Sequence, residues 1–383
     1  MPPEPRRQLG RRSTNGSVPA AGEPGRPAPE TPEVAASLSR AEADRTADTI
    51  AALQLSSGMI PRFAGGVADP WNHVEAAMAL TVAGRRAEAD AAYEWLARIQ
   101  RPDGSWHQYY TADGVDQDKL DANTIAYIAT GVWHHWLCFG DAGYLAEMWP
   151  VVQRALDFVL GLQTPRGEIL WARHADGTPW PFALLTGSSS ISHSLRCGLA
   201  IAHAVGEERP SWELALARLV HTVRHYGHDA FAPKDRWAMD WYYPVLAGVL
   251  TGSEARARMA SRRRLFVHEG EGVRCVSNQD WVTTAETCEC VLAYLAAGDQ
   301  AAALELFEWV QRLRESDGSY LTGRAFPAEV SYPDRECSTY SAAAVLLAAD
   351  ALAGDSPTSG LFVDLDALPA PLDLDPVEEP ARD

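Results

Sequence analysis

Apolar residues recur along most of the chain at the spacing of about 3.6 residues that gathers them on one face of a helix. Long stretches in which apolar and polar residues alternate, the pattern of half-buried strands, are scarce. The pattern therefore predicts an all-α chain. We expect its helices at residues 41–56, 70–83, 86–100, 121–139, 142–163, 189–205, 211–227, 236–251, 253–265, 280–297, 299–314 and 337–353.

Glycines divide these helices into pairs. A short turn with Gly follows an Ala-rich helix at Gly84, Gly140, Gly206, Gly252, Gly298 and Gly354. Between these turns the connections are long, polar and aromatic, and each leads into another helix. Helical hairpins of this length must stack on their neighbours to bury both faces. Six of them predict a single (α/α)6 toroid, with an open solenoid as the alternative. Closure is favoured because neither end carries a capping repeat.

A second repeat lies where outer helices end. Residues 100–106 (QRPDGSW), 163–169 (QTPRGEI) and 314–320 (RESDGSY) share the form Q-x3-G-x-aromatic or a close variant. This form resembles the QW motif of squalene cyclases and is common in toroidal glycosidases. Physically it is a helix end, a Gly turn and an aromatic side chain folded back. We therefore interpret Trp106 as a structural staple and not as a binding platform.

The two ends of the chain differ in composition from the rest. Residues 1–39 are rich in Pro, Gly and Arg and predict a disordered leader, residues 40–354 form the catalytic toroid, and residues 355–383 form a loose, acidic, Pro-rich tail. No secretory signal or run of about 18 apolar residues is visible. The six cysteines show no metal-ligand spacing and predict reduced, buried thiols. We expect a cytoplasmic protein.

Charge and aromatic content narrow the partners. Lys and Arg total 33 against 51 Asp and Glu, a formal charge of −18. Nucleic acid requires a basic footprint, so it is excluded as a partner, and insertion into a membrane is not expected. The 13 Trp exceed what a core needs. Because Trp combines a flat apolar face with one N–H donor, it suits a ligand platform.

Candidate binding residues gather where the long connections enter the inner helices. In a toroid these segments open on one mouth, and several of them place a carboxylate beside an aromatic residue. Stacked aromatics with carboxylates and amides are how sugar rings are held. The candidate substrate-binding residues are Trp71, Asn72, His73, Glu75, Asp121, Asn123, His193, Trp237, Asp240, Trp241, Tyr242, Asp280, Trp281, Arg335 and Glu336.

Glycoside hydrolysis needs two carboxyl groups, one protonated and one ionised. Asp69 and Asp280 precede inner helices, where capping is the alternative role, and Glu75 and Glu286 each follow six residues later. Glu286 stands among weakly polar residues, and burying it without function would be costly. No metal-binding or phosphate-binding motif is present, so no metal or cofactor is expected.

Three stretches resemble a known family. They are residues 69–78 (DPWNHVEAAM), 121–127 (DANTIAY) and 280–290 (DWVTTAETCEC). They are similar to the mycobacterial methylmannose polysaccharide hydrolases, endomannosidases among actinobacterial proteins labelled prenyltransferase-like. The resemblance spans residues 40–353 and implies an (α/α)6 fold without cofactor. It also implies endo-cleavage of α-1,4-linked 3-O-methylmannose chains, with inversion expected. By motif, the acid/base pair falls on Asp69 and Glu286, with their individual roles left open.

Two alternatives stay open at this point. A terpenoid or prenyl-transferring enzyme would suit the toroid and the QW-like turns. Squalene cyclases, however, use a D-x-D-D motif, and the nearest match, Asp116-Gln-Asp118-Lys119, has Lys in place of the last Asp. The zinc ligands of protein prenyltransferases are not evident either. A non-catalytic toroid that binds a glycan is the other alternative. The oligomeric state is undetermined, with a homodimer allowed.

Overall fold

A computed structural model describes residues 29–227 and 229–374, and this part of the chain is mostly helical. Six of the described helices are buried along nearly their whole surface, because they are apolar all round. These inner helices are α2 (Pro70–Val82), α5 (Ile128–Phe139), α7 (Leu185–Ala204), α9 (Ala238–Leu246), α11 (Thr284–Ala296) and α13 (Thr339–Ala353).

Six further described helices bury one face and expose the other. These outer helices are α1 (Arg40–Leu53), α3 (Arg86–Ile99), α6 (Ala142–Leu160), α8 (Pro210–His225), α10 (Gly252–Phe266) and α12 (Gln300–Val310). A short helix, α4 (Ala122–Ala126), precedes α5. In this part of the chain, no helix combines the length and apolar composition that a bilayer crossing requires.

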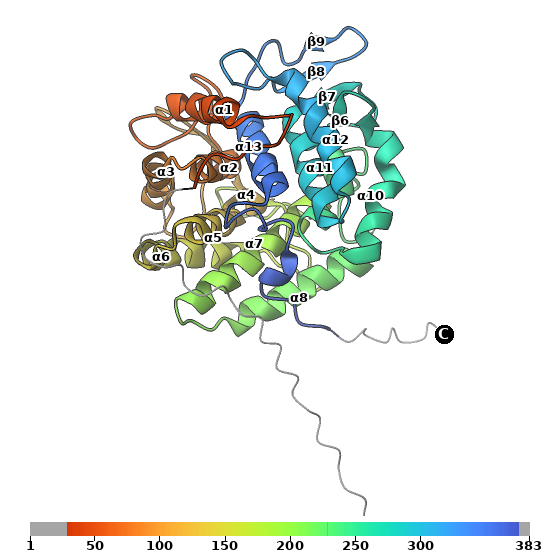
Figure 1. Cartoon of the computed structure of the whole chain (residues 1–383). Helices are drawn as coiled ribbons and strands as arrows, with labels where there is room; N and C mark the ends of the chain where they lie inside the picture. Colours follow the sequence, from red (N-terminus) through yellow and green to blue (C-terminus); the bar gives the residue numbers. More distant parts are fainter. Residues whose placement is uncertain (1–28, 228, 375–383) are drawn as a thin grey trace, which may run out of the picture.

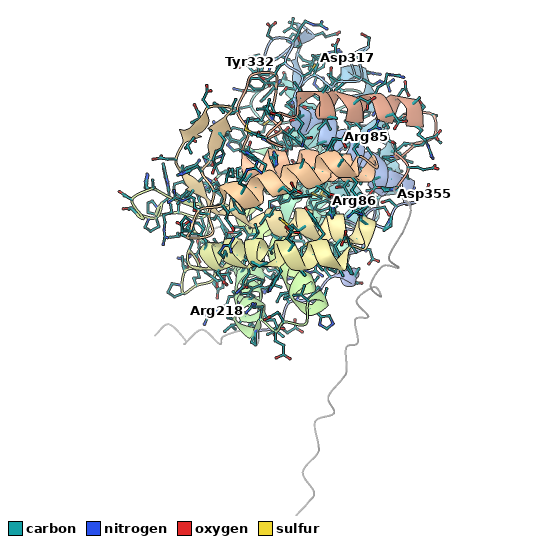
Figure 2. All side chains as sticks on the ribbon, turned by 90° about the vertical axis from the view of Figure 1, so that its left-hand side faces the viewer. Arg85, Arg86, Arg218, Asp317, Tyr332 and Asp355 are labelled. Atoms are coloured by element: carbon teal, nitrogen blue, oxygen red, sulfur yellow. The ribbon has the colours of Figure 1, made fainter. Side chains whose placement is uncertain are left out.

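The inner helices pack against one another in chain order, α2 on α5, then α7, α9, α11 and α13. The last of them, α13, also packs on α2, so the end of the helical array returns to its beginning. Figure 1 shows α3, α6, α8 and α10 at the periphery of this group. In Figure 2 the turn with Arg85 and Arg86 lies toward the same side as Asp355, whereas Tyr332 belongs to a long connection toward the other side.

Most of the predicted helices are confirmed, although several bounds differ: α9 ends at Leu246 and α12 at Val310, five and four residues before their predicted ends. The helix expected at 121–139 is interrupted at Tyr127 into α4 and α5, and α7 begins at Leu185, four residues earlier than predicted. The helix expected from residue 280 begins at Thr284, because residues 281–283 form a strand. The six turn glycines all have positive φ values between +57° and +80°, which confirms the turns.

Short strands occupy the long connections, so the all-α prediction needs a correction. Strands of two to four residues are too short to show an alternating pattern in the sequence. β1 (Tyr109–Thr111) pairs with β2 (Gly114–Gln117), and β3 (Leu120–Asp121) pairs with β4 (Ala172–Arg173). An antiparallel sheet contains, in order, β5 (Val267–His268), β6 (Gly272–Arg274), β7 (Trp281–Thr283), β8 (Gly323–Ala325) and β9 (Val330–Ser331). Two 3-10 turns, η1 (Gln311–Leu313) and η2 (Leu365–Ala367), complete the elements of this part.

The Q-x3-G-x-aromatic repeats fasten neighbouring outer helices. The Gln100 amide donates to the carbonyls of Gly104 and Val151, at 3.0 and 2.9 Å, and so ties the end of α3 to α6. Gln163 repeats this geometry with Gly167 and with Ala215 in α8. Trp106 is 1% exposed. The structural interpretation of this repeat is confirmed.

Gly104 lies in this structural turn, and replacing it should cost more stability than replacing a glycine in an open turn. Gly104 has φ +90°, and a Cβ there would lie 2.2 Å from the Arg154 carbonyl oxygen. Gly206 has φ +80°, but a Cβ there meets no atom within 4 Å. We expect Gly104→Ala to lower the free energy of unfolding by about 3 kcal/mol and Gly206→Ala by about 1 kcal/mol. Urea denaturation of both variants measures the difference, and equal losses would show that the close approach does not matter.

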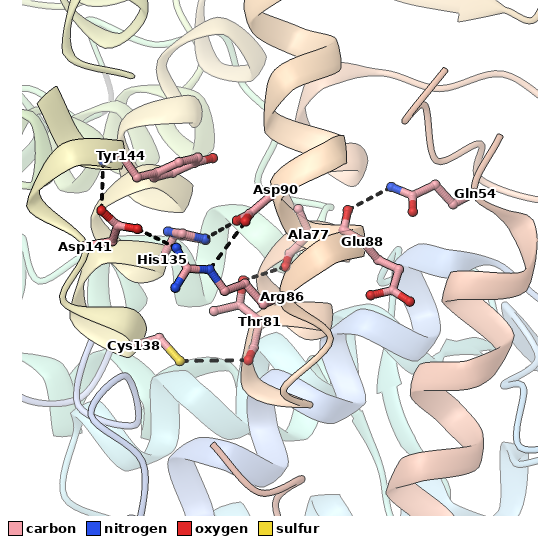
Figure 3. A network of polar contacts seen from close by, with 10 residues as sticks. All are labelled: Gln54, Ala77, Thr81, Arg86, Glu88, Asp90, His135, Cys138, Asp141 and Tyr144. Atoms are coloured by element: carbon pink, nitrogen blue, oxygen red, sulfur yellow. Dashed lines mark hydrogen bonds and ion pairs between the residues drawn. The ribbon is translucent and has the colours of Figure 1, made fainter. Parts of the chain in front are cut away.

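Charged and polar side chains also join the layers. In Figure 3 the His135 ring of α5 donates to Asp90 of α3 at 2.7 Å, and Arg86 bridges Asp90 to Asp141, the N-cap of α6. His135 is fully buried. His134 is buried as well, so both histidines of this pair belong to the core.

The C-terminal segment differs from the loose tail that we predicted. Within residues 355–374, Leu361, Leu365 and Leu368 are buried against the helical core. Arg196 of α7 donates to the carbonyls of Leu365, Leu368 and Pro369. The prediction is wrong for this segment because leucines spaced by three or four residues form an apolar face that the acids and prolines obscure.

Val34 and Leu38, inside the predicted leader, are also buried. Residues 1–28 and 375–383 lie outside the described part of the chain, so the predictions for them stay predictions.

Candidate active site

A cavity of about 520 Å³ opens where the inner helices begin. Its walls come from the N-terminal ends of α2, α4, α7, α9, α11 and α13 and from the connections before them. We refer to it as the cleft. Eight of the residues proposed from the sequence line it: Asp69, Trp71, Asn72, Asp121, Asn123, Trp237, Asp240 and Glu286. A cavity of this size, lined by aromatic and polar side chains, is suited to a small molecule or a short oligomer.

Asp69 is the N-cap of α2, and Pro70 begins that helix. Its Oδ1 accepts from the Asn72 backbone N–H at 3.0 Å, and its Oδ2 accepts from the Asn72 side-chain amide at 2.5 Å. Burial raises the pKa of Asp69, while these hydrogen bonds and the charge of Arg62 act in the opposite direction. The Asp69 side chain thus both caps α2 and lines the cleft.

Glu286 lies in the first turn of α11 and is 9% exposed. The Cys275 thiol is hydrogen-bonded to it, and burial together with this carboxylate raises the pKa of Cys275, so the thiol stays protonated. Both α2 and α11 pack on α13. The fold therefore brings two carboxyl groups that are 217 positions apart in the chain to the same cleft.

A third carboxyl group stands beside a cation. Asp121 caps α4 by accepting from the backbone N–H groups of Asn123 and Thr124. The Lys119 ammonium lies 4.0 Å from its Oδ2 and 4.0 Å from the centre of the Trp171 ring. Burial raises the pKa of Asp121 to about 6 in spite of Lys119. Asp121 and Trp171 together form a polar and aromatic wall of the cleft.

Three polar atoms on residues that line the cleft have no hydrogen-bond partner within the described residues. They are the Asn123 Oδ1, the Gln108 Oε1 and the Trp237 Nε1, and all three are buried. Buried polar groups in proteins are almost always hydrogen-bonded. Two acceptors and one donor that line one cavity are suited to the hydroxyl groups of a sugar.

The structure does not bring His73 and His193 to the cleft. The His73 ring accepts from the Ile60 N–H at 3.1 Å and donates to the Ala92 carbonyl at 2.9 Å. His193 donates to the Leu361 carbonyl and stacks on Phe362. Burial lowers the pKa of each histidine to about 4, so both are neutral. Their contacts are with the protein core and correct the prediction that they bind substrate.

Trp241 and Tyr242 also point away from the cleft. Trp241 is fully buried, stacks on Phe266 and donates its indole N–H to the Arg258 carbonyl at 2.8 Å. Tyr242 is fully buried and donates to Glu289. They follow Asp240 by one and two positions, and such neighbours face different sides of a helix.

Four predicted residues belong to the edge sheet and its connections instead. Asp280 pairs with Arg274 at 2.9 Å, and the Trp281 indole donates to the Tyr332 carbonyl at 3.0 Å. The same side of the molecule carries the ion pair of Arg335 with Glu315, and Glu336, which accepts from Thr322. None of these four lines the cleft within the described part of the chain. The prediction failed because Trp281 belongs to β7 and not to a helix start.

Several lining residues were missed by the sequence analysis. The long connections that lead from an outer helix into an inner one contain Arg62, Gln108, Tyr109, Trp171 and Lys234, with Tyr109 in the short strand β1. Irregular segments and strands of three residues carry no periodic signal that shows which side chains point inward. Two further lining residues could have been proposed from their helix positions. Tyr243 follows Asp240 by one helical turn, and Tyr340 lies in the first turn of α13.

Across residues 29–227 and 229–374, no group of three or more His, Cys, Asp or Glu side chains is placed to hold a metal ion. The described residues give the cleft carboxyl groups on separate walls, aromatic faces and two amide oxygens without a partner.

Comparison with known proteins gives one close sequence relative. The chain is 49% identical over 343 residues to an MMP endo-(1,4)-3-O-methyl-α-D-mannosidase of Mycolicibacterium hassiacum, covering 90% of this chain and 92% of the relative. No protein-family model matches the chain.

Solved structures of low sequence identity share the fold. A wild-type glycosidase superposes with a TM-score of 0.64 at 15% identity, covering 84% of this chain and 97% of its own. A D-mannose isomerase gives a TM-score of 0.63 at 11% identity, with coverages of 81% and 96%. A sugar epimerase from a ruminal bacterium gives 0.62 at 11% identity, with coverages of 81% and 97%.

Proposed function

The chain belongs to the family of the MMP endo-(1,4)-3-O-methyl-α-D-mannosidases, and from this premise we propose that it cleaves internal α-1,4 linkages of methylmannose polysaccharide. It is a glycoside hydrolase, and its substrate is a polysaccharide. The observation that carries the proposal is the meeting of Asp69 and Glu286 in one aromatic cleft, on helices far apart in the chain.

Asp69 and Glu286 are the catalytic pair in this proposal. One carboxyl group donates a proton to the glycosidic oxygen, and the other, ionised, activates water at the anomeric carbon. The two hydrogen bonds that Asn72 donates hold the Asp69 carboxyl in one orientation. Inversion at the anomeric carbon is the expected outcome, and proton NMR of the first products tests it.

The remaining cleft residues would hold the sugar. Trp71, Trp171 and Trp237 offer aromatic surface for the CH faces and methyl groups of the polymer. The unpartnered atoms of Asn123 and Gln108 would accept from hydroxyl groups. A 3-O-methylated mannose is less polar than mannose, and a cleft rich in Trp matches it.

The finer description of the fold is part of the proposal. We infer an (α/α)6 toroid of inner and outer helices, supported by the packing of α13 on α2, which an open solenoid would lack. Apart from residues 355–374, which pack on the helices, the division into a leader, a toroid from residue 40 to 354 and a tail stays a prediction. The cytoplasmic location and a homodimer also stay predictions.

The terpenoid alternative gains no support. Asp116 lies in the exposed strand β2, Asp118 is exposed in the connection after it, and neither lines the cleft. The non-catalytic alternative is separated from the proposal by experiment.

The decisive test is hydrolysis of the polysaccharide itself. We expect purified protein to shorten methylmannose polysaccharide into oligomers of intermediate length, with one new reducing end for each cut. Mass spectrometry follows chain length, and a reducing-end assay counts the cuts. Release of single sugars from one end would contradict endo-cleavage. Binding without any new reducing end would establish a glycan-binding protein instead.

A further inference from the structure

A second, much smaller cavity lies between the inner helices, beside the cleft. It measures about 20 Å³ and is lined by Glu75, Glu289, Tyr127, Tyr243 and His193, among others. A volume of this size holds one water molecule but no sugar ring. Glu75, predicted from the sequence to bind substrate, is therefore out of reach of the polysaccharide. Its partner Glu289, three residues after Glu286, was not among the predicted residues.

Tyrosine hydroxyls hold both carboxyl groups. Glu289 accepts from Tyr243 at 2.8 Å, from Tyr340 at 2.7 Å and from Tyr242. Glu75 accepts from Tyr127 at 2.9 Å. Hydrogen bonds to a carboxylate stabilise its charged form. The Trp71 side chain is also hydrogen-bonded to Glu75. With three donors on Glu289 against two on Glu75, the negative charge belongs on Glu289 and a proton on Glu75.

These tyrosines connect the buried carboxyls to the surface of the cleft. Tyr243 and Tyr340 line the cleft directly. Tyr127 stacks on Trp71, with ring centres 4.1 Å apart and planes 6° from parallel, and Trp71 also lines the cleft. Three aromatic side chains that line the cleft, Trp71, Tyr243 and Tyr340, thus depend on the positions of Glu75 and Glu289.

The surroundings make it unfavourable for both carboxyls to be charged at once. None of the described residues that line the small cavity is a lysine or an arginine. Burial, and after it the charge of Glu289, raises the pKa of Glu75. Burial, and after it the charge of Glu286, raises the pKa of Glu289. The titratable groups that face the pair are Asp69 from α2, Tyr127 after α4, His193 and Cys197 from α7, Tyr242 and Tyr243 from α9, Cys275 before α11, Glu286, Cys288 and Cys290 from α11, and Tyr340 from α13.

We propose that Glu75 and Glu289 are positioning residues: a buried carboxyl pair that holds one proton and, through Tyr127, Tyr243 and Tyr340, fixes the aromatic walls of the cleft. When the pair loses that proton, two negative charges face each other without a cation. The tyrosine contacts then rearrange, and the aromatic walls lose the geometry that binds the sugar. The kinetic part of this inference rests on the proposed function, whereas its effect on stability does not.

Stability against pH tests the pair without any substrate. Between about pH 4.5 and the titration of the folded pair near pH 7 to 8, the folded chain keeps a proton that an unfolded glutamate has released, so the free energy of unfolding falls as the pH rises. We expect the urea midpoint of the wild type to fall from about pH 4.5 to about pH 8 and to level off above that, where neither state binds the proton. In Glu75→Gln, which mimics the protonated acid, the part of this decline between about pH 6 and pH 8 should disappear.

A matched control is available on α13. Asp350 is also buried and accepts from Thr358, and burial raises its pKa to about 6. Asp350→Asn removes a buried carboxyl that does not line either cavity and titrates below pH 7. It should change overall stability and leave the decline between about pH 6 and pH 8 as in the wild type, because Asp350 is ionised in both the folded and the unfolded chain over that range. A decline that persists unchanged in Glu75→Gln would overturn the proposal.

Kinetics tests the link to the cleft. We expect the KM of the wild type for the polysaccharide to rise above about pH 7 by roughly tenfold, and Glu75→Gln to abolish this rise while Asp350→Asn retains it. If Glu75→Gln does not fold, Tyr127→Phe removes one donor from Glu75 and should move the rise in KM to higher pH. A KM profile equal to the wild type in the folded variant would show that the pair does not position the walls. If the wild type hydrolyses nothing, the proposed function fails, and the stability slopes alone decide the inference.

Discussion

Glu286→Gln and Asp69→Asn should each lower the hydrolysis of methylmannose polysaccharide by about 10³-fold, with little change in KM. Each change removes a group that must give or take a proton while the glycosidic bond breaks. An amide of the same shape does neither at neutral pH. Because Asn is itself a good N-cap, Asp69→Asn should keep the start of α2 intact. Initial rates over a range of substrate concentrations measure the effect.

The control for these variants is an acid of the outer layer. Glu308 is exposed on α12 and lines neither cavity. Glu308→Gln changes the charge as Glu286→Gln does and should keep the full rate. Circular dichroism shows whether the two cleft variants remain folded. Near-wild-type turnover in either of them would mean that the catalytic pair is wrongly assigned.

A chain that ends at Gly354 should lose about 5 kcal/mol of its free energy of unfolding. The truncation removes the buried side chains of Leu361, Leu365 and Leu368, each worth about 1.5–3 kcal/mol on burial, less the entropy gained. It also strips the Arg196 guanidinium of its three carbonyl acceptors. A buried donor without a partner costs a further 1–3 kcal/mol or so. Guanidinium denaturation measures the loss.

Two further chains show which contacts are responsible. A chain that ends at Leu374 keeps the three leucines and the Arg196 acceptors and should be as stable as the full chain. Arg196→Met removes the donor but leaves the leucines, so its loss should be smaller than that of the truncation at Gly354. If truncation at Gly354 leaves stability unchanged, the segment does not pack on α7 as described.

Most of the helices could be predicted because their signal is local. A face that is apolar every 3.6 residues and a Gly turn at its end depend on neighbouring residues alone. The same locality explains the errors. Trp281 is followed by a helical pattern, but its own strand exists only because β6 and β8 flank it in space. The leucines of residues 361–368 find their contacts only once α7 and the residues after α9 have packed together.

In the candidate site, too, the features that depend on neighbouring residues could be predicted, and those that depend on packing could not. Asp69, Asp121 and Asp240 could be proposed because they begin inner helices, where side chains open on the cleft. His73 and Trp241 were proposed on the same ground and proved to be buried, because one position along a helix rotates a side chain by about 100°. Trp171 was missed because its connection follows no period.

By itself the sequence determined the helices, their pairing and the two motif acids, since each depends on the order of residues along a short stretch. Only the tertiary structure decided which acids share a cavity. Asp69 and Glu286 meet because α2 and α11 both pack on α13, and Glu75 and Glu289 meet beside the cleft for the same reason. Which side chains lie within contact distance is a property of packed helices, and no local pattern in the chain records it.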